Sequence, residues 1–148
     1  MLVYRVCSNI ELSKILSQKC FDDIGSKYEN NYNNNHDYIP NTFYMHFFAN
    51  KEDIFHLNND LKRFICTYEI PEDVLAFYEG VGLYDGFNGH QEEYLAEFAI
   101  PSSLISMSSL KCVEALPFGF NHASFIERGD YNSTILYDGI KKPNLKKS

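Results

Sequence analysis

The amino-acid sequence predicts an α+β domain with a mixed or antiparallel sheet of five to six strands and two to four short helices. Runs of apolar, β-prone residues outnumber the helical runs, and no long crossover helices alternate with them, which argues against a doubly wound parallel sheet. The chain has 148 residues, of which 45% are hydrophobic and 22% charged. These values are ordinary for one globular domain, and a domain of this size folds without a disulfide or a metal.

The first strand and the first helix follow one another directly. Leu2 to Cys7 is an apolar run that predicts a strand. Ser8 with Glu11 three residues later forms a capping box, in which the hydroxyl and the carboxylate each satisfy a free amide at a helix start. This box and the apolar spacing after it predict a helix from about Asn9 to Gln18. Asp22 to Asn41 is polar and rich in asparagine, which predicts a loop.

Strands and short helices continue through the middle of the chain. Asn50 is expected to cap one helix, and Pro71 suits the first turn of another because its missing N–H is not needed there. Gly80 to Gly89 contains four glycines and predicts a long turn region, and Ser102 to Leu110 predicts a short helix or turn. The remaining strands are expected at Thr42 to Phe48, Arg63 to Ile70, Glu93 to Ile100, Cys112 to Leu116 and Ser133 to Tyr137. We expect a single domain over residues 1–140, with a polar loop at about 22–41 and a flexible lysine-rich tail at 141–148.

Charge and cysteine usage narrow the class of partner and the compartment. The formal charge of −7 repels phosphate backbones and anionic lipid heads, which argues against bulk nucleic acid or a membrane as a partner but allows a single nucleotide in a pocket. The four cysteines lack C-x-x-C spacing, and three lie in apolar runs, so we expect reduced, buried thiols. No secretory signal and no apolar window of about 18 residues is present, so a cytoplasmic location is expected.

Common sequence fingerprints do not fit. Gly80-Val81-Gly82 is followed by Asp85 where a dinucleotide fingerprint needs its third glycine. There is no P-loop and no G-x-S-x-G elbow, and the five histidines lack metal-ligand spacing, so no metal site is expected.

Three features of the chain could carry chemistry, and each also has a structural explanation. Arg5 interrupts an apolar strand, so its guanidinium must be paired, either with an acidic side chain or with a phosphate that it grips bidentately. The aromatic strand end around Phe47 and Phe48 fits core packing or a wall for a planar cationic ring. Gln91 and Glu93 follow the glycine region, and they fit either a solvated acidic turn or a site beside a loop.

This pattern resembles the ADP-ribosyltransferase superfamily, in its arginine-type branch. Members place an Arg or His on a first strand, an aromatic strand-to-helix corner next, and a Q/E-x-E element at the start of a later strand. Arg5 in LVYRV, Phe47-Phe48-Ala49-Asn50 in YMHFFANKEDI, and Gln91-Glu92-Glu93 in QEEYL are similar to these elements in order and spacing, over about residues 2 to 100.

The resemblance implies an ADP-ribosyltransferase-like fold and NAD as the substrate. It implies that Glu93 accepts the ribose 2′-hydroxyl and that Gln91 orients the acceptor. It also implies mono-ADP-ribosyl transfer to a macromolecular target, a protein or a nucleotide, as in a bacterial or phage effector or toxin. The positions that it assigns to NAD binding are Arg5, Tyr44, Phe47, Phe48 and Asn50.

Two alternatives remain open. Ala49 stands where the family has a hydroxyl residue, which is also the pattern of a catalytically inactive module that binds a nucleotide or a partner. In the other alternative the domain is unrelated to the family, and Arg5 and Glu93 form a structural ion pair.

Overall fold

Seven strands form one antiparallel sheet in the order β5-β6-β3-β1-β4-β7-β8, and a short eighth strand, β2, pairs with β3. This computed structural model describes residues 1–17, 21, 23–27, 39, 41–57, 62–84, 93–117 and 132–140. The strands are β1 (Leu2–Ser8), β2 (Ser26–Lys27), β3 (Phe43–Phe48), β4 (Lys62–Glu69), β5 (Glu79–Tyr84), β6 (Glu93–Pro101), β7 (Leu110–Ala115) and β8 (Thr134–Asp138). The helices are α1 (Asn9–Ser17) and α2 (Glu72–Phe77), with three short 3₁₀ helices, η1 (Lys51–Leu57), η2 (Ser102–Leu104) and η3 (Met107–Ser109). The predicted α+β class is confirmed, and the sheet has eight strands where five to six were expected.

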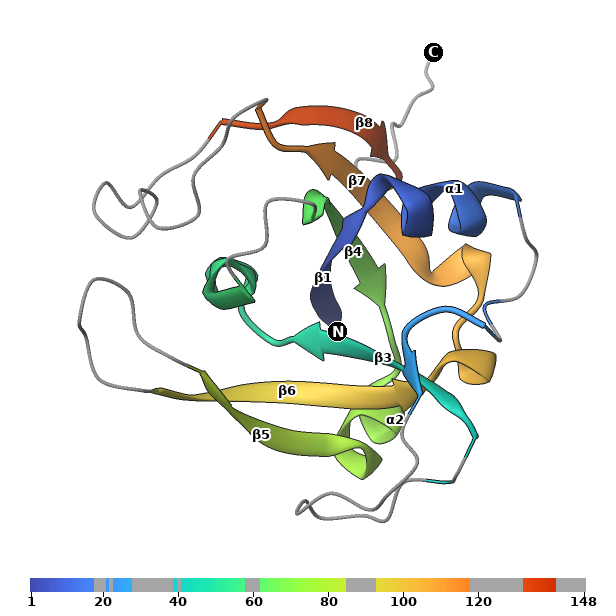
Figure 1. The fold of residues 1–148 in the computed structure, drawn as a ribbon, viewed down its shortest axis with the longest axis vertical. Helices are drawn as coiled ribbons and strands as arrows, with labels where there is room; N and C mark the ends of the chain where they lie inside the picture. The colour runs from blue at the N-terminus through green and yellow to red at the C-terminus, as the bar shows by residue number, and fades with distance from the viewer. Residues whose placement is uncertain are drawn as a thin grey trace.

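The sheet is strongly curled around the core. Figure 1 shows β5 and β6 across one side of the molecule and β7 and β8 across the other, with β1 and β4 between them. The two parts meet at β1 and β3, where the register pairs only Tyr4 with Phe48. By contrast, β1 and β4 pair along their whole length, from Leu2 opposite Glu69 to Ser8 opposite Lys62. The strands β1 and β3 therefore diverge soon after they touch.

Two hydrophobic clusters cover the two faces of the central strands. The larger includes Val3, Cys7, Phe47 and Tyr68 and is closed by α1 and α2. The smaller lies under η1 and contains Val6, Phe48, Ile54, Ile65 and Leu116. Because both faces of β1 and β3 are covered, their sequences read as nearly continuous apolar runs, as in strands that are buried on both sides.

The helix starts follow the predicted capping chemistry only in part. The Glu11 amide donates to Ser8 Oγ at 3.3 Å, as a capping box requires, but the Glu11 carboxylate binds Arg5. The segment after Asn50 is a 3₁₀ helix, in which the Asp53 amide donates to the Asn50 carbonyl and Asn50 Nδ2 donates to Asp53 Oδ2 at 3.5 Å. Asn50 thus begins this turn through its backbone carbonyl.

Two strands were not predicted. Residues 80–84, expected to be the start of a turn region, belong to β5, which pairs regularly with β6 from Glu79 opposite Phe98 to Tyr84 opposite Glu93. Glycine favours turns, but it also occurs within strands, where it weakens the strand without preventing its pairing. The two-residue β2 lies within the predicted polar loop and follows Gly25, whose φ of +105° is open to glycine and strained for other residues.

Several predictions fall outside the described residues. They concern most of the loop at 22–41, the turn at 85–90, Gln91 and the tail at 141–148. None of the helices that the structure does describe is long and apolar enough to cross a membrane.

Candidate functional site

Arg5 is bound by a carboxylate of its own chain. Arg5 Nε and Nη2 donate to the two carboxylate oxygens of Glu11 at 2.7 and 2.6 Å, and Arg5 Nη1 donates to the His46 carbonyl at 3.2 Å. The side chains of Arg5 and Glu11 are only 10% and 16% exposed. Of the two explanations for a charge in this strand, the ion pair is therefore present, and Glu11 is the partner of Arg5.

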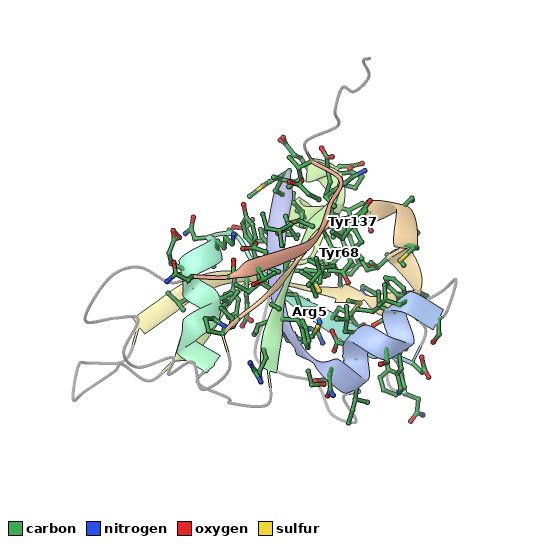
Figure 2. All side chains as sticks on the ribbon, turned by 90° about the horizontal axis from the view of Figure 1, so that it is seen from above. Arg5, Tyr68 and Tyr137 are labelled. Carbon is green, nitrogen blue, oxygen red and sulfur yellow. The ribbon has the colours of Figure 1, made fainter. Side chains whose placement is uncertain are left out.

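The divergence of β1 from β3 explains this arrangement. A strand carbonyl that loses its partner where two strands separate must be satisfied by another donor. Arg5 supplies that donor to His46, and Glu11 of α1 neutralises the guanidinium. Figure 2 shows α1 beside Arg5. Burial by itself would lower the pKa of Arg5, but the hydrogen bond and the charge of Glu11 outweigh it and raise the pKa above its usual value.

A second polar pair joins the neighbouring strands β3 and β6. His46 Nδ1 lies 3.5 Å from Glu97 Oε2, and the two side chains are 27% and 14% exposed. Glu97 stands opposite Phe48 in the register, so its side chain shares a face with the smaller hydrophobic cluster. This carboxylate and imidazole lie together on a face that otherwise carries apolar side chains of the smaller cluster, and we take the pair as a candidate site.

The Arg5 and Glu97 side chains leave the sheet on opposite faces. Arg5 is on the same face of β1 as Val3 and Cys7, which belong to the larger cluster. Glu97 is paired with Phe48 and is therefore on the face of the smaller cluster. His46 links them, because its carbonyl accepts from Arg5 and its ring touches Glu97. The result is a continuous polar chain across β1, β3 and β6.

The predicted aromatic wall is part of the packed interior. Phe47 has no exposed surface and makes an edge-to-face contact with Tyr68, with ring centroids 5.2 Å apart. Phe48 is 2% exposed in the smaller cluster, and Tyr44 is 3% exposed, its hydroxyl accepting a hydrogen bond from the Ile39 amide at 3.0 Å. Core packing therefore accounts for these three rings, while Asn50 is exposed at the corner after β3.

The predicted Q-x-E element is only partly described. Glu93 is the first residue of β6 and pairs with Tyr84, while Gln91 and the side chain of Glu93 lie outside the described part of the chain. The position of these two side chains relative to Arg5 stays a prediction.

Tyr68 places an unsatisfied hydroxyl beside the Arg5 pair. The Tyr68 side chain is fully buried, and its hydroxyl has no hydrogen-bond partner in the described structure. Burial and the nearby Cys66 raise the pKa of Tyr68 well above its usual value, and the charges of Arg5 and Glu11 also act on it. Cys7 and Cys66 lie on the same side with their Sγ atoms 3.7 Å apart, as free, buried thiols.

A further buried carboxylate lies at the other side of the sheet. The Glu114 side chain on β7 is 7% exposed, and its Oε2 lies 2.6 Å from Lys51 Nζ of η1, while Ser133 Oγ donates to its Oε1 at 2.8 Å. This pair fixes η1 against β7, and all its visible hydrogen-bonding capacity is directed at structural neighbours.

The structure also contains a hollow that the sequence did not indicate. A cavity of about 430 Å³ lies between the start of α2 and the η2–η3 segment. Its lining combines apolar side chains such as Ile70 and Val74 with Ser106, Ser109 and Lys111. Arg5, His46 and Glu97 are not among the residues that line it.

Glu97 was not predicted as a site residue, although, like Arg5, it is a charged residue within an apolar strand. Glu97 stands between Ala96 and Phe98 in an apolar strand, and a charge in such a run must be paired or functional. Glu11 was assigned to a helix cap, which hid its role as the partner of Arg5. Only the register of β3 against β6 brings His46 to Glu97.

Comparison of the chain with models of protein families, with curated proteins and with solved structures finds no match. Within the described ranges, no three His, Cys, Asp or Glu side chains gather closely enough to hold a metal ion. The α+β class therefore rests on the observed strands and their pairing, and the polar chain from Glu11 to Glu97 is the candidate site.

Proposed function

We propose that this protein transfers ADP-ribose from NAD to a macromolecular acceptor, a protein or a nucleotide, on an ADP-ribosyltransferase-like fold. A carboxylate of β6 acts at the reacting ribose. The observation that carries the proposal is the half-buried Glu97 held 3.5 Å from His46 on the adjacent strand. The proposal also draws support from the position of Glu97 on β6, the strand to which the family resemblance assigns the catalytic carboxylate.

The chemistry of glycosyl transfer suits such a carboxylate. Loss of nicotinamide from NAD leaves an oxocarbenium-like ribose, the kind of transition state that glycosidases stabilise with carboxylates. A carboxylate that accepts the ribose 2′-hydroxyl binds more strongly as positive charge develops on the ring, and a site shielded from water strengthens this effect. His46 holds the Glu97 carboxylate in a fixed place and is a positioning residue in this scheme.

Two carboxylates of β6 are candidates for this role. The family resemblance favours Glu93, and Glu97 lies four residues later on the same strand. The regular pairing of β5 with β6 gives both positions the same phase of alternation. Glu97 is 14% exposed and lies 3.5 Å from His46, and both positions are therefore tested, Glu97 for this contact and Glu93 for the resemblance.

The test is nicotinamide release from NAD in the presence of a cell extract, followed by chromatography. We expect Glu97→Gln or Glu93→Gln to lower the rate by about 100-fold or more, the usual loss when a group that stabilises the transition state is removed. Glu79→Gln, an exposed acid-to-amide change on the neighbouring β5, serves as the matched control and keeps the rate. Release that survives both changes on β6 rejects this site.

A catalytically inactive module that binds NAD or ADP-ribose is the second candidate. The Arg5 guanidinium already binds the Glu11 carboxylate, and Phe47 has no exposed surface. Both observations favour a module that does not turn NAD over. It predicts that ADP-ribose raises the melting temperature while NAD is not consumed. Turnover of NAD by the purified chain excludes it.

A further inference from the structure

We propose that Glu11 is a built-in competitor for the anion site of Arg5, so that a diphosphate ligand binds only when α1 releases the guanidinium. The inference rests on the proposed function, since it concerns how the same fold would admit the diphosphate of NAD. It assigns α1 the role of a gate and Glu11 the role of an internal substitute for phosphate.

The hydrogen-bond geometry supports this exchange. Glu11 presents two oxygens to Arg5 Nε and Nη2 at 2.7 and 2.6 Å, which is the parallel, bidentate arrangement that arginine also forms with phosphate. Lysine could neutralise a carboxylate as a point charge, but it would not offer this fork. A phosphate can therefore take the place of the Glu11 carboxylate without any change in Arg5.

The Tyr68 hydroxyl gives a second, independent reason to expect an anion here. In the register of β1 with β4, Tyr68 stands opposite Val3 and Cys66 stands opposite Arg5, so Arg5 and Tyr68 are diagonal neighbours on one face (Figure 2). The Tyr68 hydroxyl is buried and has no partner among the described residues. A phosphate in place of the Glu11 carboxylate brings additional acceptor oxygens to this face, and in the proposed complex the Tyr68 hydroxyl donates to one of them.

The helix that carries Glu11 is lightly anchored. The nine-residue α1 buries only Leu12 and Ile15, while Ile10 and Leu16 are 69% and 62% exposed. A short element with few buried contacts opens at lower free energy than the central strands. The conformation in which α1 has moved away from Arg5 is thus the minor state that a diphosphate ligand would select.

Population arithmetic sets the size of the effect. The apparent affinity for an anion equals the intrinsic affinity multiplied by the fraction of molecules in which Arg5 is released. With Arg5 released from Glu11 in about a tenth or less of the molecules, removal of the Glu11 charge raises the apparent affinity for the anion by about tenfold or more.

The experiment measures binding of inorganic pyrophosphate by calorimetry at low salt. Glu11→Gln is expected to bind it about tenfold or more tightly than the wild type. Glu69→Gln removes an exposed acid from β4 and is expected to match the wild type, which controls for net charge. The double variant Arg5→Met/Glu11→Leu replaces the pair by apolar side chains and is expected to lose binding. Equal or weaker binding by Glu11→Gln overturns the proposal.

If Glu11→Gln does not fold, hydrogen exchange of the wild type decides the question. Saturating pyrophosphate is expected to speed the exchange of the α1 amides several-fold while the β4 amides stay protected. Exchange of α1 that is unchanged or slowed overturns the proposal. Pyrophosphate binding needs no turnover, so a failure of nicotinamide release in the wild type, which concerns the proposed function, is separable from a failure of the gate.

Discussion

Substitution of Glu11 by alanine is expected to destabilise the folded protein more than any surface change. The substitution removes two charge-assisted hydrogen bonds, at 2.6 and 2.7 Å, from a guanidinium whose side chain is 10% exposed. Breaking a buried pair by deleting one partner costs about 3–5 kcal/mol, because the other charge stays buried without compensation. That is a large part of the about 5–15 kcal/mol by which folded domains are stable.

Urea unfolding followed by circular dichroism measures this change, because the free energy of unfolding falls linearly with denaturant. The melting temperature should fall by about 10 °C, given about 2–4 °C per kcal/mol for a domain of this size. Arg5→Met/Glu11→Leu is expected to return to within about 1 kcal/mol of the wild type, since apolar replacement of a buried pair is often neutral. A loss below about 1 kcal/mol for Glu11→Ala would show that the pair is solvated, as exposed pairs are, and would refute the reasoning.

Four further predictions concern buried side chains and the turn at Gly25. Tyr68→Phe removes a buried hydroxyl without a partner, so urea unfolding should show stability unchanged or raised by about 1 kcal/mol; a clear loss would mean that the hydroxyl is satisfied. Because burial raises the pKa of Tyr68, this group ionises first in the unfolded chain, and its contribution to stability should fall above about pH 10 by about 1.4 kcal/mol per pH unit; Tyr68→Phe should make the overall pH slope shallower by that amount. Gly25→Ala should cost about 2 kcal/mol or more in urea unfolding, because its φ is +105° and a Cβ would overlap the Tyr44 carbonyl; a neutral result would mean that the turn relaxes. Brief alkylation and peptide mapping should leave Cys66 unlabelled in the native state, since the hydrogen bond with Cys7 and burial raise the pKa of its thiol; rapid labelling would contradict this.

The parts of the fold that depend on local pattern were predictable from the sequence. The apolar run after Met1, the Ser8–Glu11 box and the strand end at Phe48 gave β1, α1 and β3 to within a residue or two. By contrast, the strand of residues 79–84 was not predicted, because its glycines are typical of turns and also occur in strands. Its pairing with β6 comes from tertiary context, which no window of sequence contains.

The sequence predicted that the candidate site has paired charges, but it did not predict which residues pair. The sequence showed that Arg5 needs a partner, but twenty acids were available, and a short α1 folding back over β1 selects Glu11. The proximity of His46 to Glu97 depends on the register of two strands that are about fifty residues apart in the chain. Such non-local pairs are the part of a site that composition and spacing leave open.

The most direct measurement is the initial rate of nicotinamide release from saturating NAD by the purified chain, with a cell extract as the source of the acceptor and Glu97→Gln assayed beside it at matched folded fraction. The account predicts measurable release by the wild type and a loss of about two orders of magnitude in the variant, as for other groups that stabilise developing charge. Equal rates for the two proteins would contradict the role of the carboxylate beside His46.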